Sequence, residues 1–326
     1  MARADLICAL IKSGLEKDDF ALRRTAEAIC AEERAIHHDV LANKISSLLS
    51  SSKPRTINEK MSPSIISPNG NVNQLFIEKI PTKRLEQLVL NDDVLKICRD
   101  LVEEQTRSDL LRSYGLEPRN KVLLMGPPGN GKTSIAEAIA ELMMVPLLTI
   151  RYESIIGAYL GETASRLSQL FEYAKTRQCV LFFDEFDTIG KERGDHQETG
   201  EIKRVVSSLL LQIDSLPSYV VTVAATNHDD LLDKAVWRRF QIKIDLPLPS
   251  KSNLEHWFAI FEKTHSFSFG IESGTLAKKL YGKSYAEAEE FALSVYRRYI
   301  LNGQPTKVRD ITIEQLCLYG YNTDNR

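Results

Sequence analysis

One stretch constrains the fold more than any other. Residues 126–133 read Gly-Pro-Pro-Gly-Asn-Gly-Lys-Thr and match the pattern G-x-x-x-x-G-K-S/T at every fixed position. An apolar run of strand length, Lys121–Met125, precedes this stretch, and a segment with helical spacing, 134–142, follows it. Because a strand, a glycine-rich loop and a helix in this order are the context that the pattern requires, the sequence predicts a phosphate-binding loop in an α/β fold.

The residue types in this loop suit the phosphates of a nucleotide. Glycines let backbone N–H groups approach an anion closely, and the following helix directs its positive end toward the anion. Lys132 is placed to reach the β- and γ-phosphates, and Thr133 is placed to ligate Mg²⁺. The predicted nucleotide-binding residues are Pro127, Pro128, Gly129, Asn130, Gly131, Lys132, Thr133 and Ser134. The alternative, a glycine-rich turn that binds nothing, would leave the flanking strand and helix as a coincidence.

Composition narrows the class of protein. A chain of 326 residues with a formal net charge of −2 gives no general electrostatic reason to bind nucleic acid or an anionic membrane. The N-terminus lacks the pattern of a signal peptide, and no apolar stretch reaches membrane-spanning length. The five cysteines form no C-x-x-C pair, which favours free thiols in a reducing compartment. We therefore expect a cytoplasmic protein.

Changes in composition divide the chain into four parts. Residues 1–50 are expected to form a small helical module with helices near 6–14, 19–34 and 38–49. Residues 51–73 are rich in Ser, Pro and Asn, as in flexible linkers. An α/β subdomain over 74–249 and a smaller helical lid over 250–326 follow. Whether the first module docks a partner or only supports oligomerisation is left open by its sequence.

Strands and helices alternate through the α/β subdomain. Further strands are expected at 146–150, 179–183, 220–225 and 241–245, and helices at 92–112, 164–175 and 202–213. The first of these helices is expected to bury Leu110 together with the apolar residues before it. This alternation predicts a parallel sheet with helices on both faces.

Polar residues follow two of the apolar strands. Asp184 and Glu185 end the strand 179–183, where one carboxylate can hold Mg²⁺ and its neighbour can orient or deprotonate the attacking water. Asn227 follows the strand 220–225, although asparagine often simply starts a turn. Arg238 and Arg239 suit phosphate recognition. From these residues alone, a solvated basic turn explains the arginine pair equally well.

Together, these motifs resemble those of AAA+ ATPases, in the AAA subgroup that includes katanin, spastin and protease-associated ATPases. The resemblance covers 74–326 and places Walker A at Gly126–Thr133, Walker B at Val180–Glu185 and sensor 1 at Asn227. It implies that Arg238 and Arg239 are arginine fingers that act on the nucleotide of a neighbouring subunit. It also implies a P-loop NTPase fold with a helical lid, ATP and Mg²⁺ as cofactors, and hydrolysis of ATP to ADP and phosphate.

Three segments extend the resemblance or depart from it. Residues 158–162 resemble the subgroup's pore loop, with Tyr159 and Leu160 facing a substrate channel, and residues 190–196 fall where a second pore loop would lie. Trp237 stands where several relatives have another arginine, which leaves open which of the two fingers dominates. The segment 282–288 resembles the lid's G-x-S-x-A-D/E turn, but Tyr285 replaces the usual glycine.

The resemblance implies an ATP-driven protein unfoldase or remodelling motor. Such relatives assemble as homo-hexameric rings and thread a protein substrate past loops like that of Tyr159. The chain carries no H-E-x-x-H or G-x-S-x-G peptidase signature, so a protease would be a separate polypeptide. Similar compact bacterial AAA ATPases suggest a subtilisin-like serine protease as that partner. The alternatives are an ATP-switched scaffold with slow turnover and a DNA-acting AAA+ ATPase.

Overall fold

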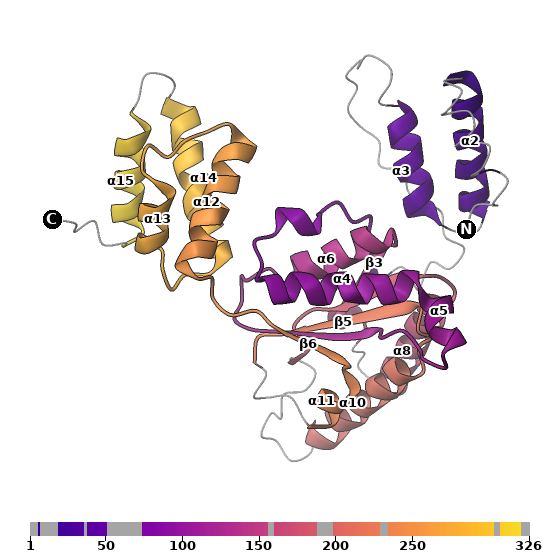
Figure 1. The fold of residues 1–326 in the computed structure, drawn as a ribbon. Coiled ribbons are helices and arrows are strands. Elements are labelled where there is room, and N and C mark those ends of the chain that lie inside the picture. The colour runs from indigo at the N-terminus through magenta and orange to yellow at the C-terminus, as the bar shows by residue number, and fades with distance from the viewer. Residues whose placement is uncertain are drawn as a thin grey trace.

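The computed structural model describes residue 6 and residues 19–35, 38–50, 74–155, 160–187, 198–228, 234–302 and 307–320. Its centre is a six-stranded sheet with the strand order β1-β3-β4-β5-β2-β6 (Figure 1). The strands are β1 Phe76–Lys79, β2 Lys121–Met125, β3 Leu147–Ile150, β4 Cys179–Phe183, β5 Val220–Thr226 and β6 Ile242–Asp245. All neighbouring strands run parallel except β1, which pairs antiparallel with β3. The predicted parallel sheet is confirmed, and the structure adds β1 to it as an antiparallel edge strand.

The edge strand β1 is the element that the sequence pattern missed. Of its four residues only Phe76 is buried, and the other three are exposed. Buried parallel strands are recognised by continuous apolar runs, and β1 has none because one side of it faces no further strand.

Helices cover both faces of the sheet, as expected. On one face lie α4 (Asp92–Thr106) and α6 (Lys132–Met143), and on the other lie α8 (Leu160–Lys175) and α10 (Glu198–Asp214). The side chains of β4 show how one strand serves two cores. Leu181 and Phe183 join the cluster with α8 and α10, whereas Val180 and Phe182 join the cluster with α4 and α6.

The single helix expected over 92–112 is two helices in the structure. The first, α4, ends at Thr106, Arg107 leaves helical geometry at φ −103° and ψ 30°, and α5 spans Ser108–Ser113. No residue of α5 is buried, and Leu110 is 54% exposed. The expectation that Leu110 is buried was therefore wrong, because the break at Arg107 redirects the chain away from the core.

Two of the three helices expected in the N-terminal module are described. They are α2 (Asp19–Ala35) and α3 (Asp39–Ser50), which bury Ile29 and Val40. The Nζ of Lys44 on α3 donates a hydrogen bond to Glu141 Oε1 on α6 at 2.8 Å. Most of the first expected helix, at 6–14, and the expected linker over 51–73 lie outside the described residues.

Four helices after β6 form a C-terminal bundle with its own core. The C-terminal bundle comprises α12 (Lys251–His265), α13 (Ser273–Lys279), α14 (Tyr285–Asn302) and α15 (Val308–Leu318). Phe258, Phe269 and Phe291 are fully buried within it. The other short helices among the described residues are η2 (Leu85–Gln87), α7 (Tyr152–Ile155) and α11 (Lys234–Arg239). Across the described part of the chain, no helix combines the length and apolarity needed to cross a membrane.

Candidate nucleotide site

A cavity of about 700 Å³ lies between the carboxyl end of the sheet and the C-terminal bundle. One part of its wall is polar and includes these residues that the sequence motifs predicted: Pro128, Gly129, Asn130, Gly131, Lys132, Thr133, Ser134, Asp184, Glu185 and Asn227. The structure thus brings three separate segments of the chain together, because parallel strands β2, β4 and β5 end at the same edge. Pro127, the remaining predicted residue of the loop, contributes a backbone carbonyl to the contacts of Lys132.

The glycine-rich loop between β2 and α6 folds as its sequence predicts. Gly129 and Gly131 have φ values of +80° and +87°, which favour glycine. The Nζ of Lys132 donates to the backbone oxygens of Gly126 at 2.6 Å and Pro127 at 3.0 Å. Burial lowers the pKa of Lys132, while the carboxylates of Asp184 and Asp187 act in the opposite direction. The loop therefore holds one buried amino group beside the space for an anion.

Thr133 and Asp184 form the candidate metal position. Thr133 Oγ1 donates to Asp184 Oδ2 at 3.2 Å, which brings a hydroxyl and a carboxylate of two different elements together. The described residues contain no cluster of three or more His, Cys, Asp and Glu side chains suited to a metal ion. Mg²⁺ commonly binds through only one or two protein oxygen groups together with water and substrate phosphates. The pair Thr133 and Asp184 fits that mode of binding.

Glu185 has an unusual backbone for a residue with a side chain. Its φ is +47°, in the left-handed region, and its side chain is exposed at the wall of the cavity. The next residue fixes this turn, because Phe186 N donates to Ala225 O at 2.7 Å and the Phe186 ring is buried against Phe183 and Phe240. A non-glycine residue held in this region costs about 1–3 kcal/mol, and such strain concentrates at functional sites.

Asp187 is a site residue that the motif search missed. It is 3% exposed, and its Oδ1 accepts from Thr226 Oγ1 at 3.2 Å and from Asn227 N at 3.4 Å. It therefore joins the end of β4 to the end of β5 and positions Asn227 at the cavity. The signal was present in the sequence, since Asp187 is the third carboxylate of Asp184-Glu185-Phe186-Asp187.

Comparison with known proteins decides the family. The family model described as "ATPase family associated with various cellular activities (AAA)" matches residues 122–248, from β2 through β6. The uncharacterized AAA family ATPase y4kL of Sinorhizobium fredii is 35% identical over 302 residues, which cover 92% of this chain and 90% of the relative. This chain belongs to the AAA family of ATPases. It therefore binds and hydrolyses ATP, and the inferred resemblance to AAA ATPases is confirmed at the level of the family.

Two further relatives show the breadth of the family around this ATPase. The 26S proteasome regulatory subunit 8 homolog of Encephalitozoon cuniculi is 30% identical over 67% of this chain and 58% of the relative. The peroxisomal ATPase pex6 of Schizosaccharomyces pombe is 33% identical over 62% of this chain and 22% of the relative. The ATPase thus spans little more than half of the first of these proteins and about a fifth of the second.

The two neighbouring arginines of the ATPase have different surroundings. Both end α11 and lie outside the cavity. Arg239 Nε donates to Asp214 Oδ2 at 2.7 Å, and Lys121 Nζ donates to the other oxygen of Asp214 at 2.9 Å. Arg238 is exposed and makes no polar contact with another described residue. The structure thus separates a paired arginine from one that points to solvent.

The opposite part of the cavity wall was not visible as a motif. It is mostly apolar and is lined by Leu88, Val89 and Leu90 after η2 and by Trp257, Ile260 and Tyr285 from the C-terminal bundle. These segments lie far apart in the sequence, so no local pattern joins them. Tyr285 and Ala286, in the turn that resembled the lid motif, do reach the cavity.

The predicted pore loop, 158–162, lies partly outside the described residues. Tyr159 falls in the gap 156–159, and Leu160 is the first residue of α8. The second expected pore segment, 190–196, falls in the gap 188–197. The pore assignment therefore stays a prediction from sequence.

Proposed function

We propose that this AAA ATPase unfolds or remodels protein substrates as a homo-oligomeric, hexameric ring. One observation carries the proposal: the described residues that line the cavity include two lysines and three carboxylates, but no arginine. ATP hydrolysis in related machines needs a cation that stabilises the charge of the transition state, and an arginine can be supplied by a neighbouring subunit. An exposed Arg238 outside its own cavity suits that role.

The proposed hydrolysis assigns one task to each side chain. Lys132 holds the β- and γ-phosphates, and Thr133 and Asp184 would hold Mg²⁺. The metal, when bound, neutralises charge that develops on the phosphates. Glu185 orients the attacking water and accepts its proton, while Asn227 positions the water or the γ-phosphate. Asp187 is buried between the ends of β4 and β5, and it keeps Glu185 and Asn227 in fixed positions relative to each other.

We assign the contact with the neighbouring subunit to Arg238 rather than Arg239. The guanidinium of Arg239 is paired with Asp214, which also binds Lys121 on β2. Arg239 would have to break its ion pair with Asp214 before it could reach a neighbouring subunit, whereas Arg238 would not have to break such a contact. Arg238→Ala should therefore reduce turnover more than Arg239→Ala does. A finger can contribute roughly 10³–10⁵ in rate.

Protein substrates are supported by the relatives and by the sequence of the pore segment. Several similar proteins are named for proteasome regulation, including the proteasome-activating nucleotidase of Methanopyrus kandleri, which is 31% identical over 67% of this chain. Tyr159 lies between Gly157 and Gly161 and directly precedes α8, which leads to β4 and the carboxylates. An aromatic ring there can grip an extended chain by apolar contact without reading its sequence.

The test of the motor uses two readouts on one preparation. Phosphate release and the loss of fluorescence of a folded reporter are measured for the wild type, Tyr159→Ala and the control Tyr114→Ala. Tyr114 is 78% exposed beyond α5 and is absent from the cavity wall. We expect Tyr159→Ala to retain most ATP hydrolysis and to lose reporter unfolding. The control should retain both hydrolysis and unfolding. Unfolding by Tyr159→Ala at the wild-type rate would contradict threading and favour an ATP-switched scaffold.

We further propose a separate subtilisin-like serine protease as the recipient of unfolded chains. The support is that the sequence lacks a peptidase signature and that similar ATPases are named for proteasome regulation. A Glu185→Gln variant, which should retain ATP, can be used to capture its partner. Recovery of a serine protease from the native host with this variant and ATP, but not with Lys132→Ala, is expected. Equal recovery with both variants would contradict an ATP-dependent partnership.

A further inference from the structure

A second, smaller cavity of about 130 Å³ adjoins the nucleotide cavity. It is lined by Asp245–Ser250, the connection that links β6 to α12 and hence the sheet to the C-terminal bundle. Four residues line both cavities: Val89, Leu90, Asn130 and Tyr285. These four residues therefore form the partition between the nucleotide site and the hinge of the C-terminal bundle.

Asn130 connects the phosphate loop to this hinge. Its side chain is 2% exposed, and its Nδ2 donates to the backbone oxygen of Leu246 at 3.2 Å. Its Oδ1 is buried and has no hydrogen-bond partner among the described residues. Gly126 touches the same carbonyl, because a Cβ at Gly126 would lie 2.3 Å from Leu246 O. A buried amide with one unsatisfied atom lowers the stability of the fold, so its presence beside the hinge calls for a functional explanation.

Tyr285 connects the C-terminal bundle to the segment after η2, within the apolar part of the cavity wall. Its hydroxyl donates to the backbone oxygen of Val89 at 2.9 Å. The next residue, Ala286, donates its N–H to Gly129 O in the phosphate loop at 3.0 Å. Burial raises the pKa of Tyr285 to about 12, so the hydroxyl remains a donor at neutral pH. The bundle is thus tied to the phosphate loop at one point and to the wall of the cavity at another.

We propose that Asn130 and Tyr285 are positioning residues that hold the C-terminal bundle against the phosphate loop and thereby set the rate of nucleotide release. A nucleotide between the loop and the bundle leaves only when these elements separate. Separation must break the Tyr285–Val89 hydrogen bond, and movement of the hinge must break the Asn130–Leu246 hydrogen bond. Both contacts therefore slow release without touching the reacting atoms. This inference requires only that the AAA ATPase binds nucleotide, so it is independent of the proposed ring and motor.

The test compares two tyrosine substitutions that each remove one hydroxyl from the same part of the bundle. Tyr285→Phe removes the donor to Val89, whereas the control Tyr281→Phe removes a hydroxyl from a side chain that is 59% exposed. The chain has two tryptophans, and Trp257 lines the nucleotide cavity. In a Trp237→Phe background, the emission of Trp257 then reports nucleotide release when bound ADP is chased with excess ATP in a stopped-flow instrument.

We expect ADP to leave Tyr285→Phe about 2- to 10-fold faster than the parent, as for the loss of one hydrogen bond. Tyr281→Phe should release ADP at the parental rate. Thermal unfolding without nucleotide should be nearly the same for all three proteins. A parental release rate in Tyr285→Phe would overturn the assignment of this residue. A lower unfolding temperature without nucleotide, together with an unchanged release rate, would show a purely structural role and would also overturn it.

Asn130 is tested by Asn130→Ala in the same background. Loss of the donor to Leu246 should also accelerate ADP release about 2- to 10-fold. The matched control is Asn120→Ala, which also removes a buried side-chain amide that donates to backbone oxygens, but at the opposite end of β2 from the phosphate loop. Unchanged or slower release from Asn130→Ala would overturn its role. Equal acceleration by both substitutions would show that the loss of any buried amide suffices, which would overturn the specific assignment to Asn130.

Discussion

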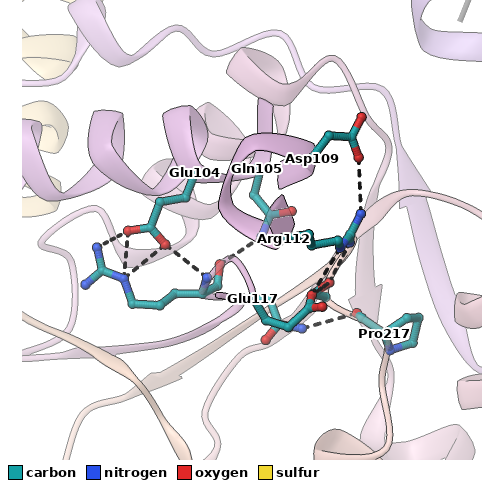
Figure 2. Close-up of polar contacts among 9 residues, drawn as sticks. Glu104, Gln105, Asp109, Arg112, Glu117 and Pro217 are labelled. Carbon is teal, nitrogen blue, oxygen red and sulfur yellow. Dashed lines mark hydrogen bonds and ion pairs between the residues drawn. The ribbon is translucent and has the colours of Figure 1, made fainter. Parts of the chain in front are cut away.

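The two ends of the parallel sheet use charged residues in opposite ways. At the carboxyl end, Glu185 is held in a strained turn at the cavity wall and Lys132 is partly withdrawn from solvent. At the amino end, the charged residues pair with one another, as Figure 2 shows. Charges are paired with one another at the end of the sheet that only holds the chain together, whereas they line a cavity at the end where we propose that ATP is hydrolysed.

The first part of the amino-end network connects α4 to the start of β2. Arg119 donates its backbone N–H to Glu104 Oε2 at 3.0 Å and its Nε to Glu104 Oε1 at 2.8 Å (Figure 2). Gln105 Nε2 donates to the backbone oxygen of Arg119 at 2.8 Å. The hydrogen bond from Arg119 is the main cause that lowers the pKa of Glu104. Both charges of the pair therefore have a partner.

The second part connects the starts of β2 and β5. Glu117 Oε2 accepts from Ser218 Oγ at 2.8 Å and from Arg112 Nε at 3.4 Å. The side chain of Asn120 is buried and donates to the backbone oxygens of Val220 at 2.9 Å and Pro217 at 3.2 Å. These contacts hold the elements at the amino end of the sheet together, and we call them the structural clamp.

The largest expected effect comes from one substitution made at both ends. Glu185→Gln should lower ATP turnover by on the order of 10²–10⁴ while ATP still binds, because it removes the base but keeps the shape. Glu104→Gln, the same chemical change at the amino end, should leave turnover within a few-fold of wild type. Steady-state phosphate release and equilibrium binding of a labelled ATP analogue measure the two quantities. A similar loss of turnover in both variants would contradict the claim that the two ends of the sheet have different roles.

Asn120→Ala should produce the converse result. It leaves two backbone carbonyls without their side-chain donor, so the free energy of unfolding should fall by about 1–3 kcal/mol. Affinity for nucleotide should stay near that of the wild type, since Asn120 lies at the opposite end of β2 from the phosphate loop. Urea denaturation and ATP-analogue titration measure the two effects. Weaker binding without a loss of stability would contradict the clamp.

The smallest expected effect is a pH dependence of Glu104. Its pKa is lower in the folded protein than its ordinary value of 4.5, so its stabilising contribution is present above pH 4.5 and is lost as the pH falls through the lower folded pKa. Because the pair is partly exposed, Glu104→Gln should cost less than about 1 kcal/mol near neutral pH. The difference from wild type should shrink as the pH falls below 4.5. A difference that grows as the solution becomes acidic would have the wrong sign for this ion pair.

Sequence predicted the carboxyl end of the sheet well because its elements are local. The glycine loop and the carboxylates each follow an apolar strand, and parallel strands must bring these ends together. The strained turn at Glu185 was not predicted, since it depends on tertiary contacts of the next residue. Asp187 is visible in the sequence as a third carboxylate, but its hydrogen bonds to the end of β5 are not, since only the folded sheet brings them together.

Other parts of the structure could not be read from local patterns. The edge strand β1 lacks an apolar run, and Arg107 breaks an otherwise helical pattern without a glycine or proline. The apolar wall of the cavity joins Val89 to Trp257 and Tyr285, which only tertiary folding brings together. The different surroundings of Arg238 and Arg239 also depend on Asp214, which lies on α10, 25 residues before Arg239 in the sequence.

The most direct test of the proposed ring mixes two inactive variants. Glu185→Gln lacks the base but retains Arg238, whereas Arg238→Ala retains an intact site but lacks the arginine for its neighbour. Each should hydrolyse ATP poorly alone. In an equimolar mixture, an Arg238→Ala site beside a Glu185→Gln neighbour is complete, so random assembly should restore up to about a quarter of wild-type turnover. Turnover equal to the sum of the separate proteins, with mixed assemblies shown to form, would contradict an active site completed by Arg238 of a neighbouring subunit.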